Sequence, residues 1–267
     1  RKKGLASAAK KASRIAAEGL VAVAVDGNKG AVVEVNSETD FVAKNDMFQE
    51  YVADAALVAL MHNGEVCDMK TFQCPKVHKS FEERLTDLIA KIGENMNLRR
   101  AAMLEVSNGV IASYVHNACK PNLGKIGVLV ALESNGDKAK LQELGKHIAM
   151  HVAASNPQFL TIADVDQASI DHEKAIFSEQ AKASGKPENI IEKMVEGRIK
   201  KYFDEVVLEE QAYIMDPDKK VKQIVADAAK EMGADIKLKA FVCFRLGEGL
   251  EKRNEDFAAE VASQLKK

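Results

Sequence analysis

The chain has 267 residues, a net charge of -2 and a hydrophobic fraction of 46%, with 5 prolines and 16 glycines. These totals are typical of a folded globular protein of one large or two ordinary domains, and they exclude a disordered chain. The near-neutral charge argues against a general polyanion binder. No apolar run reaches the length of a membrane span, no signal-peptide pattern is present, and we expect a cytoplasmic protein with reduced thiols. The four cysteines, at positions 67, 74, 119 and 243, include no C-x-x-C pair. This spacing argues against a structural zinc site and against a disulfide framework.

Residues 1–18 are predicted to form a helix and a linker. Arg1-Lys2-Lys3-Gly4 precedes a run rich in alanine and lysine, and the chain does not start with Met, which indicates the interior of a longer protein. A basic tail that binds nucleic acid is the alternative interpretation. The short length of the run and the acidic balance of the chain disfavour it.

Residues 19–108 predict a first structural unit that starts with two strands. Residues 19–25 alternate small and branched apolar side chains, a turn follows at 26–30, and residues 31–36 form the return strand. A helical pattern then starts at Asp46, where Asp46 and Gln49 resemble a capping box.

The rest of this unit contains a loop, a helix and a strand. The first helix ends at Asn63-Gly64, and residues 65–79 have Pro75 and no clear period, which indicates a variable loop. Leu85, Leu88, Ile89 and Ile92 mark a second helix that ends at Gly93. Residues 98–106 are expected to form the third strand.

The same order of elements returns in residues 109–166 and 208–250. Residues 109–115 and 125–132 parallel the two strands of the first unit, and a helix with one apolar face follows. After a long interruption, Met232 to Lys239 matches Ile92 to Arg99, and a strand over 240–246 closes the copy. The sequence therefore predicts an α+β fold in which a β-β-α-α-β unit is duplicated and antiparallel sheets carry helices on one face.

The interruption, residues 167–207, predicts two helices folded back on each other as an antiparallel coiled coil. Apolar residues recur at steps of three and four along both arms, and Ser184-Gly185-Lys186-Pro187 divides them. The alternative is a solvated helix packed on the main body, which the narrow apolar seam disfavours. Residues 251–267 predict a C-terminal amphipathic helix that docks either on its own core or on a partner.

The segment from Asn36 to Asn45 is the leading candidate for function. An apolar strand enters it, a helix leaves it, and it carries one large apolar side chain, Phe41, beside the carboxylate of Asp40. Loops on a rigid scaffold are where partner contacts concentrate. A hydrophobic staple, with Phe41 tucked under the following helix, is the alternative.

Enzymatic and nucleotide-binding motifs are absent. Neither a P-loop nor a G-x-G-x-x-G loop occurs, so we expect no bound nucleotide, cofactor or metal. His147 and His151 have the i, i+4 spacing of zinc ligands, but the glutamate of a zinc protease is missing, and ordinary helix histidines are favoured. A hydrolase using Cys119 and His116 as nucleophile and base would lack an orienting third group.

Several separated motifs resemble the elongation factor Ts family over essentially the whole chain. They are Asn36-Ser37-Glu38-Thr39-Asp40-Phe41-Val42-Ala43-Lys44, Lys91-Ile92-Gly93-Glu94-Asn95, Tyr114-Val115-His116, His147-Ile148-Ala149-Met150-His151 and Glu192-Lys193-Met194-Val195-Glu196-Gly197-Arg198. The family's small N-terminal helical domain, with its Cys-Lys-Lys-Ala-Leu-type motif, has no counterpart here, and we expect the chain to lack it.

The resemblance implies a guanine nucleotide exchange factor, without enzymatic activity of its own, that binds elongation factor Tu in its GDP-bound and nucleotide-free forms. It implies that the loop Thr39, Asp40, Phe41 and Val42 acts near the Mg²⁺ and phosphate site of the partner. By the same resemblance, further contact residues are Ile92, Gly93, His116, Ile214 and Met215, with Phe257 and Val261 in a C-terminal contact. Core packing is the alternative for Ile214 and Met215. A nucleic-acid binder is the rival function, but Lys and Arg are interleaved with Asp and Glu rather than clustered.

Overall fold

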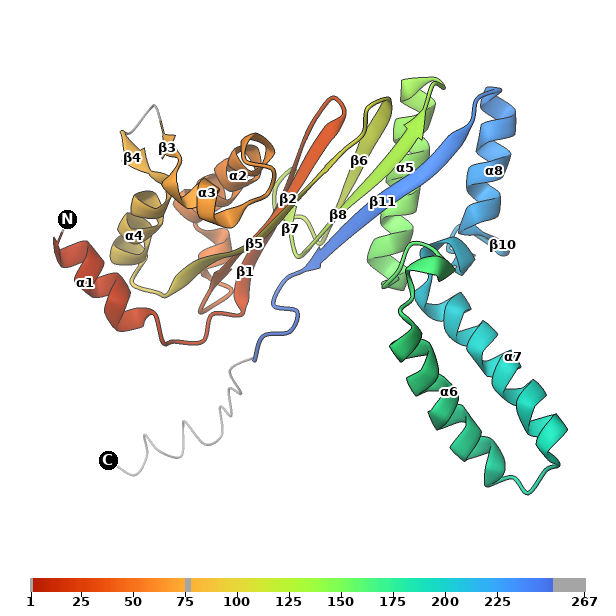
Figure 1. Cartoon of the computed structure of the whole chain (residues 1–267). Helices are drawn as coiled ribbons and strands as arrows, with labels where there is room; N and C mark the ends of the chain where they lie inside the picture. Colours follow the sequence, from red (N-terminus) through yellow and green to blue (C-terminus); the bar gives the residue numbers. More distant parts are fainter. Residues whose placement is uncertain (1, 75–77, 252–267) are drawn as a thin grey trace.

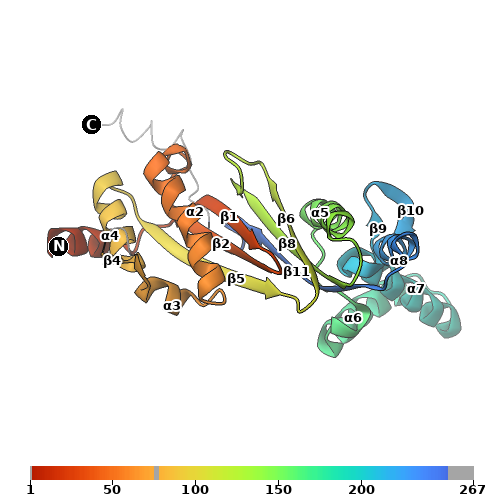
Figure 2. The same ribbon diagram turned by 90° about the horizontal axis from the view of Figure 1, so that it is seen from above.

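The computed structural model describes residues 2–74 and 78–251. Two antiparallel sheets lie at the centre and pack face to face, and helices cover their outer sides (Figures 1 and 2). None of the helices in these described residues is long and apolar enough to cross a membrane.

The first unit has the predicted order of strands and main helices. Helix α1 precedes it and packs against α4. The strand order is β5-β2-β1, with antiparallel pairing throughout. Its elements, after α1 (Lys2–Lys11), are β1 (Glu18–Asp26), β2 (Lys29–Ser37), α2 (Asp46–Met61), α3 (Val66–Thr71), β3 (Gln73–Cys74), β4 (Lys79–Ser80), α4 (Phe81–Ile92) and β5 (Met96–Glu105).

The second unit repeats this arrangement. Its strand order is β11-β8-β6, so the second strand of the unit is again central and all pairs are antiparallel. Its elements are β6 (Gly109–His116), β8 (Ile126–Ser134), α5 (Lys138–Ser155), α8 (Val221–Met232) and β11 (Ile236–Arg245). The predicted α+β fold with a duplicated β-β-α-α-β unit is confirmed.

The strands are apolar on both faces because each sheet is covered on both sides. Along β1, Leu20 and Ala22 point toward α2 and the first helical layer, while Val21 and Val23 point toward the second sheet. Along β8, Val128 and Val130 face the helices of the second unit, and the alternate residues face the first sheet. Successive side chains of a strand point to opposite faces of the sheet, so both the odd-numbered and the even-numbered positions of these strands carry apolar residues.

Glycines let the two sheets approach closely. A Cβ added at Gly127 of β8 would lie 2.6 Å from Val21 Cγ1, and one at Gly30 of β2 would lie 2.5 Å from Ile111 Cγ2. These contacts are shorter than van der Waals packing allows, so larger residues at these positions would force the sheets apart.

A buried carboxylate joins the two units at one end of the sheets. Glu34 of β2 is fully buried and accepts hydrogen bonds from Arg99 Nη1 (3.1 Å), Arg100 Nε (2.5 Å) and the Gly247 N–H (2.8 Å). Burial by itself raises the pKa of Glu34, but the bonds from Gly247, Asn36 and Arg100 outweigh it and hold the pKa below its ordinary value. The segment after β11 is therefore fixed to the first sheet.

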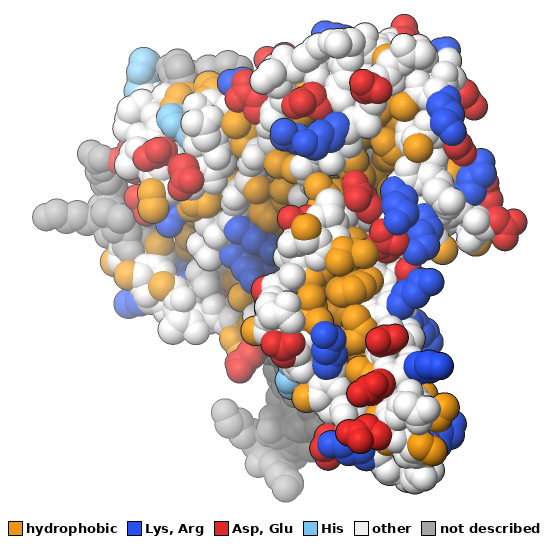
Figure 3. Space-filling view, turned by 45° about the vertical axis from the view of Figure 1, so that its right-hand side comes forward, with side chains coloured by type: hydrophobic (Ala, Val, Ile, Leu, Met, Phe, Trp, Pro, Cys, Tyr) orange, Lys and Arg blue, Asp and Glu red, His pale blue; other side chains and the backbone are white. Residues whose placement is uncertain are grey.

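The insertion is a helical hairpin that projects from the body (Figure 1). Helices α6 (Gln167–Lys182) and α7 (Glu188–Val206) pack on each other, with Ala181 and Ile199 buried between them. Figure 3 shows a stripe of hydrophobic side chains along the hairpin, flanked by charges. The predicted antiparallel hairpin is confirmed, and the alternative of a helix lying on the main body is excluded.

The base of the hairpin is tied to the body by backbone hydrogen bonds. The N–H groups of Gln158 and Phe159 donate to Val206 O at 2.8 and 3.1 Å. Short 3-10 helices, Ile162–Asp164 and Leu208–Glu210, flank the insertion, and a small hairpin of β9 (Ala212–Tyr213) and β10 (Asp216–Lys220) leads into α8.

Two local predictions are corrected, and one short strand was not predicted. Residues 65–79 are not simply a loop, because they contain α3, β3 and the first residue of β4, and Met69 of α3 is fully buried against the first core. The cap of α2 is Asn45, whose side chain accepts from the amides of its first turn, whereas Gln49 Nε2 donates to Ala43 O (2.7 Å). The loop between β6 and β8 contains β7 (Leu123–Gly124), which pairs with β1 and extends the first sheet.

Candidate partner-binding surface

The connection between β2 and α2 is a tight turn. Residues 42–44 form one turn of 3-10 helix, in which the Ala43 N–H donates to Asp40 O (3.2 Å) and the Lys44 N–H to Phe41 O (3.1 Å). Asn45 then caps α2 with its side chain. These bonds satisfy the backbone groups of the turn locally, so the segment is a short ordered loop.

Phe41 is presented on the outside of this loop. Its side chain is 75% exposed, whereas Val42, the next residue, is 3% exposed and belongs to the first core. This exposure excludes the hydrophobic staple. Asp40 is exposed beside Phe41, and Thr39 is half-buried. Among the four loop residues predicted as contacts, Val42 therefore anchors the loop in this conformation, and Asp40 and Phe41 carry the accessible side chains.

The turn between α4 and β5 lies against this loop. Glu94 accepts two hydrogen bonds from Thr39, one from the backbone N–H (3.0 Å) and one from Oγ1 (2.6 Å). Glu38 accepts a bond from the Asn95 N–H (2.6 Å). The structure thus brings the predicted contact residues at 92–93 next to those at 39–42.

Ile92 and Gly93 form the end of α4. Ile92 is half-buried and packs on the first core. Gly93 has φ +89° and ends the helix, with its N–H donating to Ile89 O (2.9 Å). No atom lies within 4 Å of a Cβ built on Gly93, so the left-handed backbone, and not crowding, favours glycine here.

The second unit reaches the same area through its β6–β8 connection. Lys120 Nζ lies 2.7 Å from Asp46 Oδ1 at the start of α2, and this bond lowers the pKa of Asp46. His116, four residues earlier, is exposed, and its Nδ1 lies 3.1 Å from Tyr114 Oη. The connection that follows His116, the last residue of β6, therefore contacts the start of α2, directly after the candidate loop.

Ile214 and Met215 lie elsewhere. They form the turn of the β9–β10 hairpin, at the opposite end of the molecule from α4 (Figures 1 and 2). Their exposed fractions are 40% and 48%, so core packing does not account for either side chain.

A buried histidine, His151, contacts the backbone of the turn that carries Ile214 and Met215. His151 Nε2 lies 2.8 Å from Gln211 Oε1, and its Nδ1 accepts from the Ile214 N–H (3.2 Å). Because Nδ1 accepts, the ring is the neutral tautomer with its proton on Nε2. Burial lowers the pKa of His151 and outweighs the opposing effect of Gln211.

The predicted C-terminal contact residues, Phe257 and Val261, lie outside the described residues, as does the predicted C-terminal helix from residue 252 onward.

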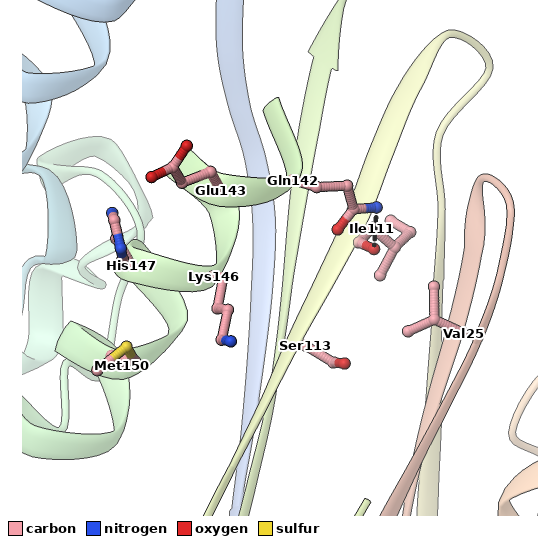
Figure 4. A pocket seen from close by; sticks show the side chains of 8 residues that line it. All are labelled: Val25, Ile111, Ser113, Gln142, Glu143, Lys146, His147 and Met150. Atoms are coloured by element: carbon pink, nitrogen blue, oxygen red, sulfur yellow. Dashed lines mark hydrogen bonds between the residues drawn. The ribbon is translucent and has the colours of Figure 1, made fainter. Parts of the chain in front are cut away.

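A hollow beside α5 is separate from the candidate loop, and Figure 4 shows the side chains that line it. It measures about 520 Å³ and is lined by α5 and by the neighbouring ends of β1 and β6. Val25 of its wall pairs with Gly30 at the start of β2, whereas the candidate loop follows Ser37 at the other end of that strand. Gln142 donates to Ile111 O (3.1 Å) and covers an outer carbonyl of the edge strand β6.

The described residues do not form the zinc site or the Cys-His catalytic site considered as alternatives. His147 lines the hollow while His151 is buried with Gln211 and Ile214, so the pair does not converge. Within residues 2–74 and 78–251, no three His, Cys, Asp or Glu side chains are grouped as metal ligands. Cys119 Sγ lies 3.9 Å from Gln49 Nε2 and 3.7 Å from Leu123 O, and His116 contacts Tyr114 instead.

Comparison with known proteins identifies the family. The elongation factor Ts family model matches residues 38–248, a span that includes the candidate loop, both sheets and the hairpin. The chain belongs to the elongation factor Ts family. Elongation factor Ts of Paramagnetospirillum magneticum is 58% identical over 264 residues, which cover 99% of this chain and 85% of that protein.

Other elongation factor Ts proteins are similarly related. The protein of Rhodospirillum rubrum is 57% identical over 268 residues, covering 100% of this chain and 87% of its own, and that of Bartonella bacilliformis is 54% identical over 266 residues with the same coverage. Membership of the elongation factor Ts family assigns the chain a role in translation elongation.

Proposed function

We propose that this chain is a guanine nucleotide exchange factor that binds elongation factor Tu carrying GDP and accelerates GDP release. The single observation that carries the proposal is Phe41, an aromatic side chain 75% exposed on an ordered loop in a chain of this family. A rigid exposed aromatic is the kind of side chain that anchors protein interfaces, because it buries a large apolar area at little entropic cost.

The loop is expected to act on the partner's nucleotide site from outside. A G protein holds GDP with backbone amides around the phosphates and with Mg²⁺. Phe41 would enter an apolar pocket between helices of the partner, and Asp40, which is exposed beside it, would bring a negative charge toward the same region. Both effects weaken the packing and the electrostatics that retain Mg²⁺ and GDP. This mechanism requires no reacting group from the chain, so we propose an exchange factor and not an enzyme.

The remaining contacts form two groups. Ile92 and Gly93 directly precede Glu94, which binds the candidate loop, and they would extend the same interface. His116 ends β6, and the connection that follows it contacts the start of α2 through Lys120, so His116 would contribute from the second unit. Ile214 and Met215, exposed at the far end of the molecule, would contact another domain of the partner. Phe257 and Val261 would add a C-terminal contact. Two separated contacts on one rigid scaffold raise the effective concentration of the second after the first has formed.

The proposal includes no direct nucleotide, nucleic-acid or membrane contact, and it places the protein in the cytoplasm. The chain contains 38 Lys and Arg residues against 40 Asp and Glu residues, and Figure 3 shows the two signs interspersed over the face that it presents. A nucleic-acid interface would need a clustered basic surface.

The test is the release of a fluorescent GDP from elongation factor Tu with excess unlabelled GDP in solution. The chain is expected to increase the rate constant of release in proportion to its concentration until the partner is saturated. A rate constant that stays at the intrinsic value at all concentrations of the chain would refute the proposed function.

A further inference from the structure

Glu94 holds the candidate loop through a two-point contact. One carboxylate oxygen accepts the Thr39 N–H at 3.0 Å and the other accepts Thr39 Oγ1–H at 2.6 Å. Both donors of one residue are therefore bound by both acceptors of one side chain. Hydrogen bonds to an ionised group are the stronger class, and a two-point contact fixes orientation as well as distance.

A reciprocal contact lies beside it. Glu38 Oε1 accepts the Asn95 N–H at 2.6 Å, so each of the two segments sends a carboxylate to a backbone amide of the other. Asn95 Nδ2 donates to Arg14 O (2.8 Å), and Arg14 Nη1 lies 3.4 Å from Glu38. The Glu38 side chain is 11% exposed. Residues 38–39 and 94–95 are thus joined by three hydrogen bonds across 55 to 57 positions of sequence.

Gly93 makes this geometry possible. Its φ of +89° ends α4 and turns the chain so that Glu94 faces the loop. An L-residue rarely adopts this conformation, whereas glycine adopts it freely. The open space around Gly93 is compatible with a direct partner contact, but its backbone already accounts for the glycine.

We propose that Glu94 is a positioning residue for exchange: by binding Thr39 it holds the loop in the conformation that directs Phe41 outward. The proposal rests on the proposed exchange function. Phe41 has few contacts of its own, since its side chain is 75% exposed, and its direction is set by the backbone on either side. Buried Val42 fixes that backbone after Phe41, and the Glu94 contact fixes it before. A loop held in its binding conformation loses less conformational entropy on association.

The test compares Glu94→Gln and Glu38→Gln with wild type in two assays. Glutamine keeps the size of the side chain but replaces one carboxylate oxygen by a donor, so one bond to Thr39 is lost in the first variant and the bond to Asn95 is weakened in the second. The control is Glu192→Gln, which removes the same charge from an exposed position of α7. Thermal melts verify that every variant is folded.

The first assay measures deuterium uptake by residues 37–45 of the free chain, and the second measures chain-stimulated GDP release from elongation factor Tu. Loss of a charge-assisted hydrogen bond corresponds to about a tenfold change in an equilibrium. We therefore expect uptake to be about tenfold faster and the second-order rate constant of release about tenfold lower in Glu94→Gln. Glu38→Gln should change both in the same direction, and Glu192→Gln should match wild type.

A double-mutant cycle with Thr39→Val separates positioning from direct contact. If Glu94 acts through Thr39, the second substitution adds little to the first, so the combined fold-loss is well below the product of the single ones. Fold-losses that multiply would overturn the proposal, because Glu94 would then contact the partner independently. Unchanged uptake in Glu94→Gln, or raised uptake with unaltered release, would also overturn it. A wild-type chain that does not accelerate release would instead refute the proposed function, and the uptake assay would still decide whether Glu94 orders the loop.

Discussion

Phe41→Ala should reduce exchange far more than it reduces stability. Complete burial of a Phe side chain stabilises a protein by about 1.5–3 kcal/mol, and Phe41 is 75% exposed, so truncation should lower the free energy of unfolding by less than about 1 kcal/mol. At an interface, the loss of an aromatic anchor costs about 2 kcal/mol or more, which is roughly a 30-fold lower second-order rate constant for stimulated GDP release.

Val42→Ala is the matched control one residue away. Val42 is 3% exposed in the first core, so removing two methyl groups should cost about 2 kcal/mol of stability. For a protein of this size that lowers the melting temperature by roughly 4–8 °C, against no more than about 4 °C for Phe41→Ala. Thermal melts and stopped-flow release of fluorescent GDP measure both. A large melting shift with unaltered exchange in Phe41→Ala would show that Phe41 supports the fold and does not contact the partner.

Three further predictions concern the scaffold. Replacing residues 168–203 by a short Gly-Ser linker should leave a cooperative melt, because the arms pack on each other and the bonds of Val206 at the base remain; loss of the melt would make the arms part of the core. Glu34→Gln should lower the free energy of unfolding in urea by about 2–4 kcal/mol, because Arg99 and Arg100 lose a buried ionic partner. The control Glu248→Gln, which breaks an exposed pair with Arg100, should lower it by less than about 1 kcal/mol, and equal losses would contradict the prediction. Folding lowers the pKa of His151, so the unfolded chain binds the proton more readily than the folded chain. The free energy of unfolding should therefore decrease as the pH falls below about 6.5, by at most about 1.4 kcal/mol per pH unit, and should not depend on His151 above that pH. The same pH dependence in His151→Gln would exclude His151 as the cause.

Much of the fold is predictable because it follows from local periodicity and repetition. The strands of both units alternate small and branched apolar residues, the long helices have one apolar face, and Gly93 and Gly233 end the last helix of each copy with positive φ. The projecting hairpin is predictable from a narrow apolar seam on each arm. These signals lie within segments of about ten residues or in a comparison of two such segments, and each is stronger than the competing local preferences.

Short elements escape such reasoning. Helix α3 has six residues, which is less than two turns, so no period can be read from it. Strand β7 has two residues, and its pairing with β1 joins positions about 100 residues apart. Their place is set by tertiary packing, as the full burial of Met69 shows, and not by the propensity of the segment.

The loop itself is predictable, but what holds it is not. Phe41 in a polar connection is visible in the sequence, whereas the bonds of Glu38 and Glu94 join residues that only the fold brings together. Glu34 did carry a signal: a single acid inside an apolar run, with Arg99-Arg100 on another strand of the same unit, favours a buried ion pair. Its link to Gly247 depends on how the two units pack.

The most direct measurement of the central claim is a calorimetric titration of the chain into nucleotide-free elongation factor Tu and into the same protein loaded with GDP and Mg²⁺. If the chain weakens GDP binding by some factor, GDP must weaken binding of the chain by the same factor. The account therefore predicts much tighter binding to the nucleotide-free form, with a ratio of affinities equal to the factor by which the chain weakens GDP binding. Equal affinities for the two forms would contradict it, because the chain would then dock on its partner without acting on the nucleotide.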